Sequence, residues 1–160
     1  MNSTERNKAV PASYAILEKN GQILLGRRIN TGYYDGYYTV PSGHVEEGEL
    51  PIGALIREVK EEIGVDIKTE DVQLIHTMFR AKHDATGQRA DYFFLVKKWL
   101  GEPVNSEPYK CDELRWFPSE QMPEKMMHHV RYALECRKKG VSYSEIPFTS
   151  EWLNPNSKPV

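Results

Sequence analysis

The sequence contains few cysteines and no long apolar run. Cys111 and Cys136 are the only two cysteines in 160 residues, and neither has a Cys-X-X-Cys partner or a suitably spaced histidine. This pattern excludes a disulfide framework or a cysteine-based zinc site and is typical of a reducing compartment. No window approaches the ~18 uninterrupted apolar residues of a membrane span, and residues 1–8 lack the apolar segment of a signal peptide. We therefore expect a soluble, cytoplasmic protein without a membrane partner.

The chain also lacks an excess of charge of either sign. It has 21 Lys and Arg against 23 Asp and Glu, a net charge of -2. Nucleic-acid binding depends on a clustered basic surface, because much of its affinity comes from counterion release. We therefore expect no stable nucleic-acid partner. Without repeats, low-complexity stretches or composition breaks, residues 1–160 are predicted to form one domain, with a core at about 12–139 and frayed ends at 1–8 and 154–160.

The first predicted element is a β-hairpin. Apolar runs at 14–17 and 22–25 flank Asn20-Gly21, and this dipeptide between such runs is typical of a two-residue turn. The β-formers at 37–40 predict a short strand. The polar, glycine-containing stretch 42–49 predicts a loop.

A helix is predicted from Pro51 to Ile63. Proline suits its first turn and Gly64 its C-terminal cap. One apolar stripe at helical spacing is formed by Ile52, Leu55, Ile56, Val59 and Ile63.

Three strands and a second helix are predicted beyond residue 64. The strands are expected at 72–79, 91–99 and 114–117, and the helix at 126–139, closed by Gly140. The helix should face Met127, Val130, Tyr132 and Leu134 inward. This order predicts an α+β fold, an α/β/α sandwich on a mixed β-sheet.

Three acidic residues stand close together on the first predicted helix. Glu58, Glu61 and Glu62 are spaced i, i+3 and i+4, so their carboxylates share one patch and repel one another. A divalent cation would compensate this repulsion, and all-oxygen ligands suit Mg²⁺ or Mn²⁺. The alternative is a solvated helix face with Arg57 and Lys60 as neighbours.

The acidic helix belongs to a longer pattern of fixed spacing. Gly43 is followed after five residues by Glu49 and, after seven more, by Arg57-Glu58-Val59-Lys60-Glu61-Glu62-Ile63-Gly64-Val65. At every specified position this pattern resembles the signature of the Nudix hydrolase family. The signature covers residues 43–65, and the order of strands and helices extends a weaker likeness to about 12–139.

The resemblance implies a Nudix-type α/β/α sandwich and a hydrolase that cleaves a nucleoside diphosphate linked to a group X. A metal-activated water would attack phosphorus, in keeping with what divalent cations do for phosphate chemistry. It implies that Glu58, Glu61 and Glu62 are metal ligands, that the carbonyl of Gly43 completes the site, and that Glu58 helps deprotonate or orient water.

The resemblance also implies roles for residues around the metal. Arg57 would complete the catalytic set by pairing with Glu49 or with a catalytic carboxylate; the alternative is an ordinary surface ion pair. Arg28 would lie near the substrate phosphates, and strand alternation would point Arg27 the other way. His44, inside the signature loop, is a candidate phosphate contact.

One further acid is expected from a loop after the long strand. The candidates are Glu107, as a metal ligand or base, and the pair Asp112-Glu113. The remaining histidines lack metal-like partners and are interpreted as surface residues or as incidental to function: His76, His83, His128 and His129. Four tyrosines before the signature are expected to pack in the fold rather than stack on a base: Tyr33, Tyr34, Tyr37 and Tyr38.

The expected substrate is a small, nucleotide-like molecule. The short chain resembles the MutT-like branch, which acts on free nucleoside triphosphates, including oxidised ones, and releases a monophosphate and pyrophosphate. The alternatives are a nucleotide-sugar, dinucleoside-polyphosphate or RNA 5′-end pyrophosphohydrolase, and a non-catalytic ligand-binding regulator. A homodimer is compatible with the family, but no interface is evident in the sequence.

Overall fold

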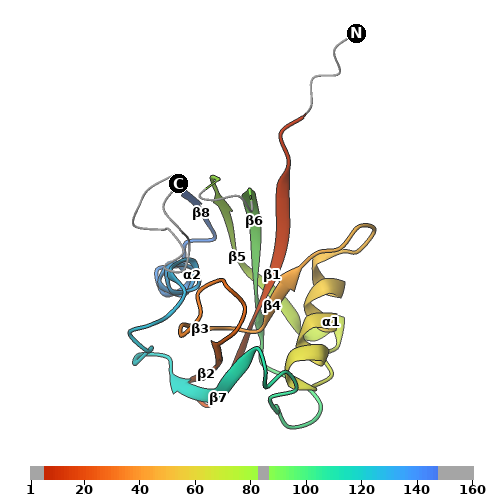
Figure 1. Cartoon of the computed structure of the whole chain (residues 1–160), viewed down its shortest axis with the longest axis vertical. Coiled ribbons are helices and arrows are strands. Elements are labelled where there is room, and N and C mark those ends of the chain that lie inside the picture. The colour runs from red at the N-terminus through yellow and green to blue at the C-terminus, as the bar shows by residue number, and fades with distance from the viewer. Residues whose placement is uncertain (1–5, 83–86, 148–160) are drawn as a thin grey trace.

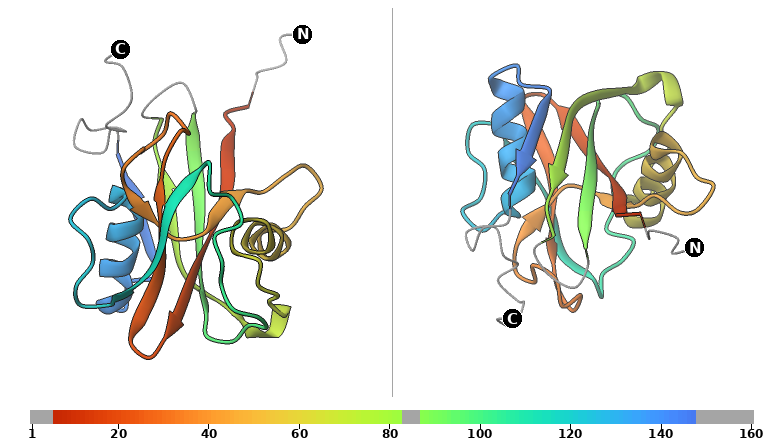
Figure 2. Two further views of the ribbon diagram at one scale, coloured as in Figure 1. Left: turned by 60° about the horizontal axis from the view of Figure 1, so that its bottom comes forward. Right: turned by 90° about the horizontal axis from the view of Figure 1, so that it is seen from above.

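Two helices cover opposite faces of a mixed β-sheet (Figures 1 and 2). The computed structural model describes residues 6–82 and 87–147. In chain order the elements are β1 (Ala9–Lys19), β2 (Gln22–Arg28), β3 (Tyr38–Thr39), β4 (Ser42–His44), α1 (Pro51–Ile63), the 3-10 turn η1 (Thr69–Asp71), β5 (Val72–Arg80), β6 (Gln88–Val96), β7 (Cys111–Pro118), α2 (His128–Lys138) and β8 (Tyr143–Ile146).

Strand β1 links the two parts of the sheet. The main strand order is β3-β2-β1-β6-β5-β8, with β4 paired to β1 and β7 paired to β2. β1 is parallel to β6 and β5 is parallel to β8, whereas the other pairs are antiparallel. The predicted mixed sheet is confirmed.

The sheet separates two hydrophobic clusters. Successive side chains of a strand point to opposite faces, so Leu17 packs with Leu55 of α1, whereas Ile16 packs with Val130 of α2. All four side chains are completely buried. Burying each contributes ~1.5–3 kcal/mol, so the alternation in β1 fixes both helices against the sheet.

The hairpin and the first helix confirm the sequence prediction. Asn20 and Gly21 have φ values of 52° and 71°, the left-handed conformations that a two-residue hairpin turn requires. α1 spans Pro51–Ile63, as predicted, and ends at Gly64 with φ 74°. Its buried stripe positions α1 on the sheet and leaves its acidic residues at the edge of that contact.

Three predicted boundaries are corrected. The stretch predicted as a loop contains β4, because the backbone of Gly43 pairs with Ser13 of β1. α2 begins at His128 rather than Met126, because the chain before it forms backbone hydrogen bonds with Tyr38. Ordered structure also continues beyond residue 139, where β8 adds an edge strand beside β5.

Two of the histidines interpreted as surface or incidental residues are buried, so the surface interpretation is wrong for them. His76 is 1% exposed and hydrogen-bonds through its two ring nitrogens with the carbonyl of Val141 and the hydroxyl of Ser144, at 2.8 and 2.7 Å. His129 is also 1% exposed and lies 3.1 Å from the Tyr14 hydroxyl. Both histidines have hydrogen-bond partners far away in the sequence, which sequence spacing alone does not reveal.

The other aromatic and histidine predictions have mixed outcomes. Tyr34 and Tyr38 are buried in the core, as expected. His128 is partly buried, with its ring 5.6 Å from the ring of Tyr34. His83 and most of the predicted frayed ends lie outside the described residues. Within residues 6–82 and 87–147, neither helix has the length and apolar character needed to span a membrane.

Candidate active site

A cavity of about 690 Å³ lies beside α1 and β4. It contains nearly all the residues that the sequence predicted for the site. Those lining it are Arg28, Gly43, His44, Arg57, Glu58, Glu61, Glu62 and Glu107. Glu49 is not in the wall but contacts it through Arg57.

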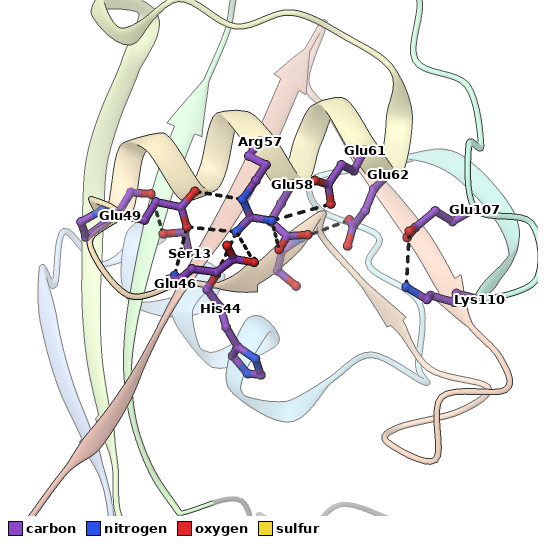
Figure 3. Close-up of polar contacts among 12 residues, drawn as sticks. Ser13, His44, Glu46, Glu49, Arg57, Glu58, Glu61, Glu62, Glu107 and Lys110 are labelled. Carbon is purple, nitrogen blue, oxygen red and sulfur yellow. Dashed lines mark hydrogen bonds and ion pairs between the residues drawn. The ribbon is translucent and has the colours of Figure 1, made fainter.

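Arg57 connects the acidic side chains of the site (Figure 3). Its Nε and Nη2 donate to the two carboxylate oxygens of Glu49 at 2.9 and 3.0 Å. Nη1 donates to Glu58 Oε1 at 2.7 Å, and Nη2 also donates to the His44 carbonyl at 3.1 Å. The hydrogen bonds from Arg57 to Glu49, followed by one from the Glu46 backbone N–H, lower the pKa of Glu49 to about 2. The two partners predicted for Arg57 are therefore both engaged.

Gly43 brings the backbone of β4 against Glu58. A Cβ atom at position 43 would lie 2.0 Å from Glu58 Cδ and 2.1 Å from Oε1, far inside van der Waals contact. Only glycine lets this carboxylate lie against the strand. The packing of Glu58 against β4 therefore explains why the signature requires glycine at position 43.

The surroundings of Glu58 and Glu62 disfavour the charged form of both carboxyl groups. Burial, followed by the neighbouring charge of Glu58, raises the pKa of Glu62 to about 8, although the Ser42 backbone N–H donates to Glu62 at 3.2 Å. Burial likewise raises the pKa of Glu58, against the stabilising contact from Arg57. A site that raises carboxylate pKa values in this way favours an additional cation.

The carboxylates do not form a closed ligand set as they stand. Among the described residues, no three His, Cys, Asp or Glu side chains lie close enough together to hold a metal ion. The physical reason is that Arg57 draws Glu58 toward itself, while Glu61 is 53% exposed and only 3.6 Å from Arg57 Nη1. The donor set is nonetheless all oxygen, which fits Mg²⁺ or Mn²⁺.

The structure distinguishes the candidate loop acids. Glu107 lines the cavity, where its charge contributes to the raised pKa values of Glu58 and Glu62. Its partner is Lys110, at 3.3 Å. In contrast, Asp112 forms an ion pair with Arg27 at 2.8 Å. Neither Asp112 nor Glu113 is among the described residues that line the cavity.

Arg28 of β2 and His44 of β4 also line the cavity. Arg28 donates to the Tyr33 carbonyl at 2.7 Å and to Thr31 Oγ1 at 3.1 Å, so neutral acceptors orient its guanidinium. Burial, followed by the positive charge of Arg89, lowers the pKa of His44.

Sequence reasoning missed a buried ion pair beside the site. Asp91 is completely buried, and its carboxylate accepts hydrogen bonds from Arg80 at 2.5 and 3.4 Å. Arg80 lies in β5 and Asp91 in β6, the strand paired with it. Opposite charges on adjacent strands are the pattern that such a pair requires.

The chain matches the family model described as "NUDIX domain" over residues 7–135. It is 30% identical over 99 residues to the 8-oxo-dGTP diphosphatase of Proteus vulgaris, covering 61% of this chain and 84% of that protein. It is 28% identical over 145 residues to the RNA pyrophosphohydrolase of Agrobacterium fabrum, covering 78% and 85%. It spans only 37% of the length of Nudix hydrolases 5 and 2 of Arabidopsis thaliana.

The fold comparison agrees with the sequence comparison. The crystal structure of a MutT Nudix hydrolase from Burkholderia pseudomallei superposes with a TM-score of 0.74 at 26% identity, covering 81% of this chain and 98% of that one. The family model covers most of the chain, and the signature residues surround one cavity. The chain therefore belongs to the MutT-like Nudix hydrolases.

Proposed function

We propose that this protein is a divalent-metal-dependent hydrolase that cleaves a nucleoside triphosphate to a monophosphate and pyrophosphate. Oxidised nucleotides belong to the same proposal, supported by the similarity to 8-oxo-dGTP diphosphatases. The RNA 5′ end is the second candidate, supported by the Agrobacterium relative. The chain's net charge of -2 favours the free nucleotide.

One observation carries the proposal. Glu58, Glu61 and Glu62 extend from one face of α1 into the cavity that Arg28 enters from β2 (Figure 3 shows the acidic side). Acidic residues and a guanidinium in the wall of one cavity suit a substrate whose phosphates contact both a metal and a cationic side chain.

In this proposal Glu58, Glu61 and Glu62 hold the metal, with the Gly43 carbonyl and Glu107 as the further oxygen donors. When bound, a divalent cation neutralises phosphate charge and makes water a stronger nucleophile. Arg57 positions Glu58 through its 2.7 Å hydrogen bond, and Glu49 holds Arg57 from behind. Arg28 and His44 orient the phosphate chain.

The test is a hydrolysis screen in Mg²⁺ over canonical and oxidised nucleoside triphosphates, nucleotide sugars, dinucleoside polyphosphates and 5′-triphosphate RNA. Glu58→Gln should abolish turnover of the best substrate without unfolding the protein. Glu135→Gln, a matched change at an exposed position of α2, should leave turnover intact. Equal rates in Glu58→Gln and the wild type would contradict the proposal.

A further inference from the structure

A second cavity, of about 330 Å³, adjoins the candidate active site. Its wall contains residues of β1, β2, β4, β5 and β6 together with Met127, the residue before α2. The two cavities share Arg28, Ser42, Gly43 and His44, so the second begins where the first ends. A substrate held at Glu58 would therefore lie beside the second cavity, with β4 in the wall of both.

The second cavity is strongly cationic. Arg28, Arg80 and Arg89 line it, and none of the described residues in its wall is acidic. The nearest balancing charge is Asp91, which lies behind Arg80 and holds that guanidinium in place at 2.5 Å. Three guanidiniums against one carboxylate leave a net positive field, and that field contributes to lowering the pKa of His44.

Arg28 and Arg80, two of the three cationic groups, are held in place by other residues of the protein. Arg80 is 8% exposed, and its ion pair with Asp91 fixes its position. Tyr33 accepts a bond from Arg28 through its carbonyl, and its ring lies 5.5 Å from the Arg28 guanidinium carbon. Preorganised guanidiniums are well matched to phosphate oxygens, and they lose little entropy on binding.

We propose that this second cavity, named here the arginine subsite and defined by Arg28, Arg80 and Arg89, binds a phosphate group of the substrate other than the one attacked. This deepens the proposed function and rests on it. Such a phosphate has two sources, the terminal phosphate of a nucleoside triphosphate or a phosphomonoester on another group X. Apolar atoms of Met127 and Ala12 in the same wall leave room for the attached chain.

Binding without metal tests the subsite independently of turnover. In EDTA and low salt, inorganic tripolyphosphate would be titrated calorimetrically into the wild type, Arg89→Gln, Arg89→Lys and Arg115→Gln. Arg89 is partly exposed, so its replacement leaves the Arg80–Asp91 pair intact; melting temperatures check this. Arg115 is a matched arginine on β7 outside both cavities, in a 3.5 Å exposed ion pair.

The expected result is tripolyphosphate binding that Arg89→Gln weakens about 10- to 100-fold, the effect of losing one hydrogen bond to a charged group. Arg89→Lys should restore part of the affinity, because the positive charge remains. Arg115→Gln should bind as the wild type does. No binding by the wild type, or equal binding by Arg89→Gln, would overturn the proposal.

Kinetics then distinguish the two sources of phosphate. If the terminal phosphate occupies the subsite, Arg89→Gln should raise KM about tenfold or more for a nucleoside triphosphate. If a phosphomonoester on group X does, the same rise should appear for a nucleotide sugar whose sugar carries a phosphate. KM for a nucleotide sugar with no additional phosphate on its sugar should not change. An effect that follows the base rather than the phosphate count would overturn the proposal. If no substrate is hydrolysed, the proposed function fails, while metal-free binding still decides the subsite.

Discussion

Replacing Gly43 with alanine should lower the rate of hydrolysis while changing the stability of the protein little. An added Cβ would lie 2.0 Å from Glu58 Cδ, whereas ordinary contact begins at 3.4 Å, so the carboxylate must move by about 1.4 Å. The atom displaced is the end of a flexible side chain, and Gly43 is not among the positive-φ glycines. The backbone therefore tolerates alanine, and the strain falls on the position of Glu58.

The expected loss follows from this displacement. Moving a reacting or positioning group by ~1 Å costs on the order of 100-fold in rate. We therefore expect kcat/KM of Gly43→Ala to fall about 100-fold, equivalent to ~2.7 kcal/mol, while the free energy of unfolding changes by less than ~1 kcal/mol.

The assay is steady-state hydrolysis of the best triphosphate in Mg²⁺, with a thermal melt of each variant. The control is Gly53→Ala on the outer face of α1, where the nearest atom to an added Cβ is 3.8 Å away. Alanine should stabilise this helix by ~0.5–1 kcal/mol and leave the rate unchanged. Wild-type activity in Gly43→Ala would refute the role of the Gly43–Glu58 contact.

Three further predictions follow from the contacts of charged residues. Arg57→Gln should lower kcat/KM about 10- to 100-fold, because Glu58 loses the group that positions it, while Lys60→Gln on the same helix should be neutral in the same assay. Asp91→Asn should cost ~3–5 kcal/mol and lower the melting temperature by on the order of 10 °C in calorimetry, because it leaves Arg80 buried without its ion-pair partner. Because folding raises the pKa of Glu62 from 4.5 to about 8, the folded state holds this proton more tightly than the unfolded state. In EDTA, the contribution of Glu62 to the free energy of unfolding should therefore be greatest below pH 4.5 and be lost as the pH rises through about 8. Melting temperatures should therefore fall between pH 6 and 9 in the wild type. An equal fall in Glu62→Gln, which lacks the titrating carboxyl, would contradict the assignment.

Local patterns predicted the elements that hold the acidic helix. The Asn20-Gly21 turn and the helix from Pro51 to Gly64 depend on residues adjacent in sequence, so turn chemistry, capping and apolar periodicity sufficed. The signature spacing likewise predicted which residues share the cavity, because Gly43 precedes the helix that carries the glutamates.

Long-range pairing could not be predicted in the same way. β4 exists because Gly43 meets Ser13, and His76 is buried because Ser144 approaches it from another strand. Neither contact has a local sequence signal. The arginine subsite is a stronger example, since its arginines come from three different strands and meet only after the sheet has formed.

The helical spacing predicted that the three carboxylates share one patch, but in the structure their positions also depend on Arg57. Arg57 compensates part of the charge by drawing Glu58 toward itself, so three acids at helical spacing do not form a ready-made metal site. Spacing fixes the face of the helix that a side chain occupies, whereas the neighbouring charges decide its rotamer.

The most direct test of the account is the rate of nucleoside triphosphate hydrolysis as Mg²⁺ is titrated into EDTA-treated wild type and Glu58→Gln. The wild type should show a saturable rise from zero with release of monophosphate and pyrophosphate, whereas Glu58→Gln should show almost no response. Hydrolysis that persists in excess EDTA, or an equal Mg²⁺ response in both proteins, would contradict it.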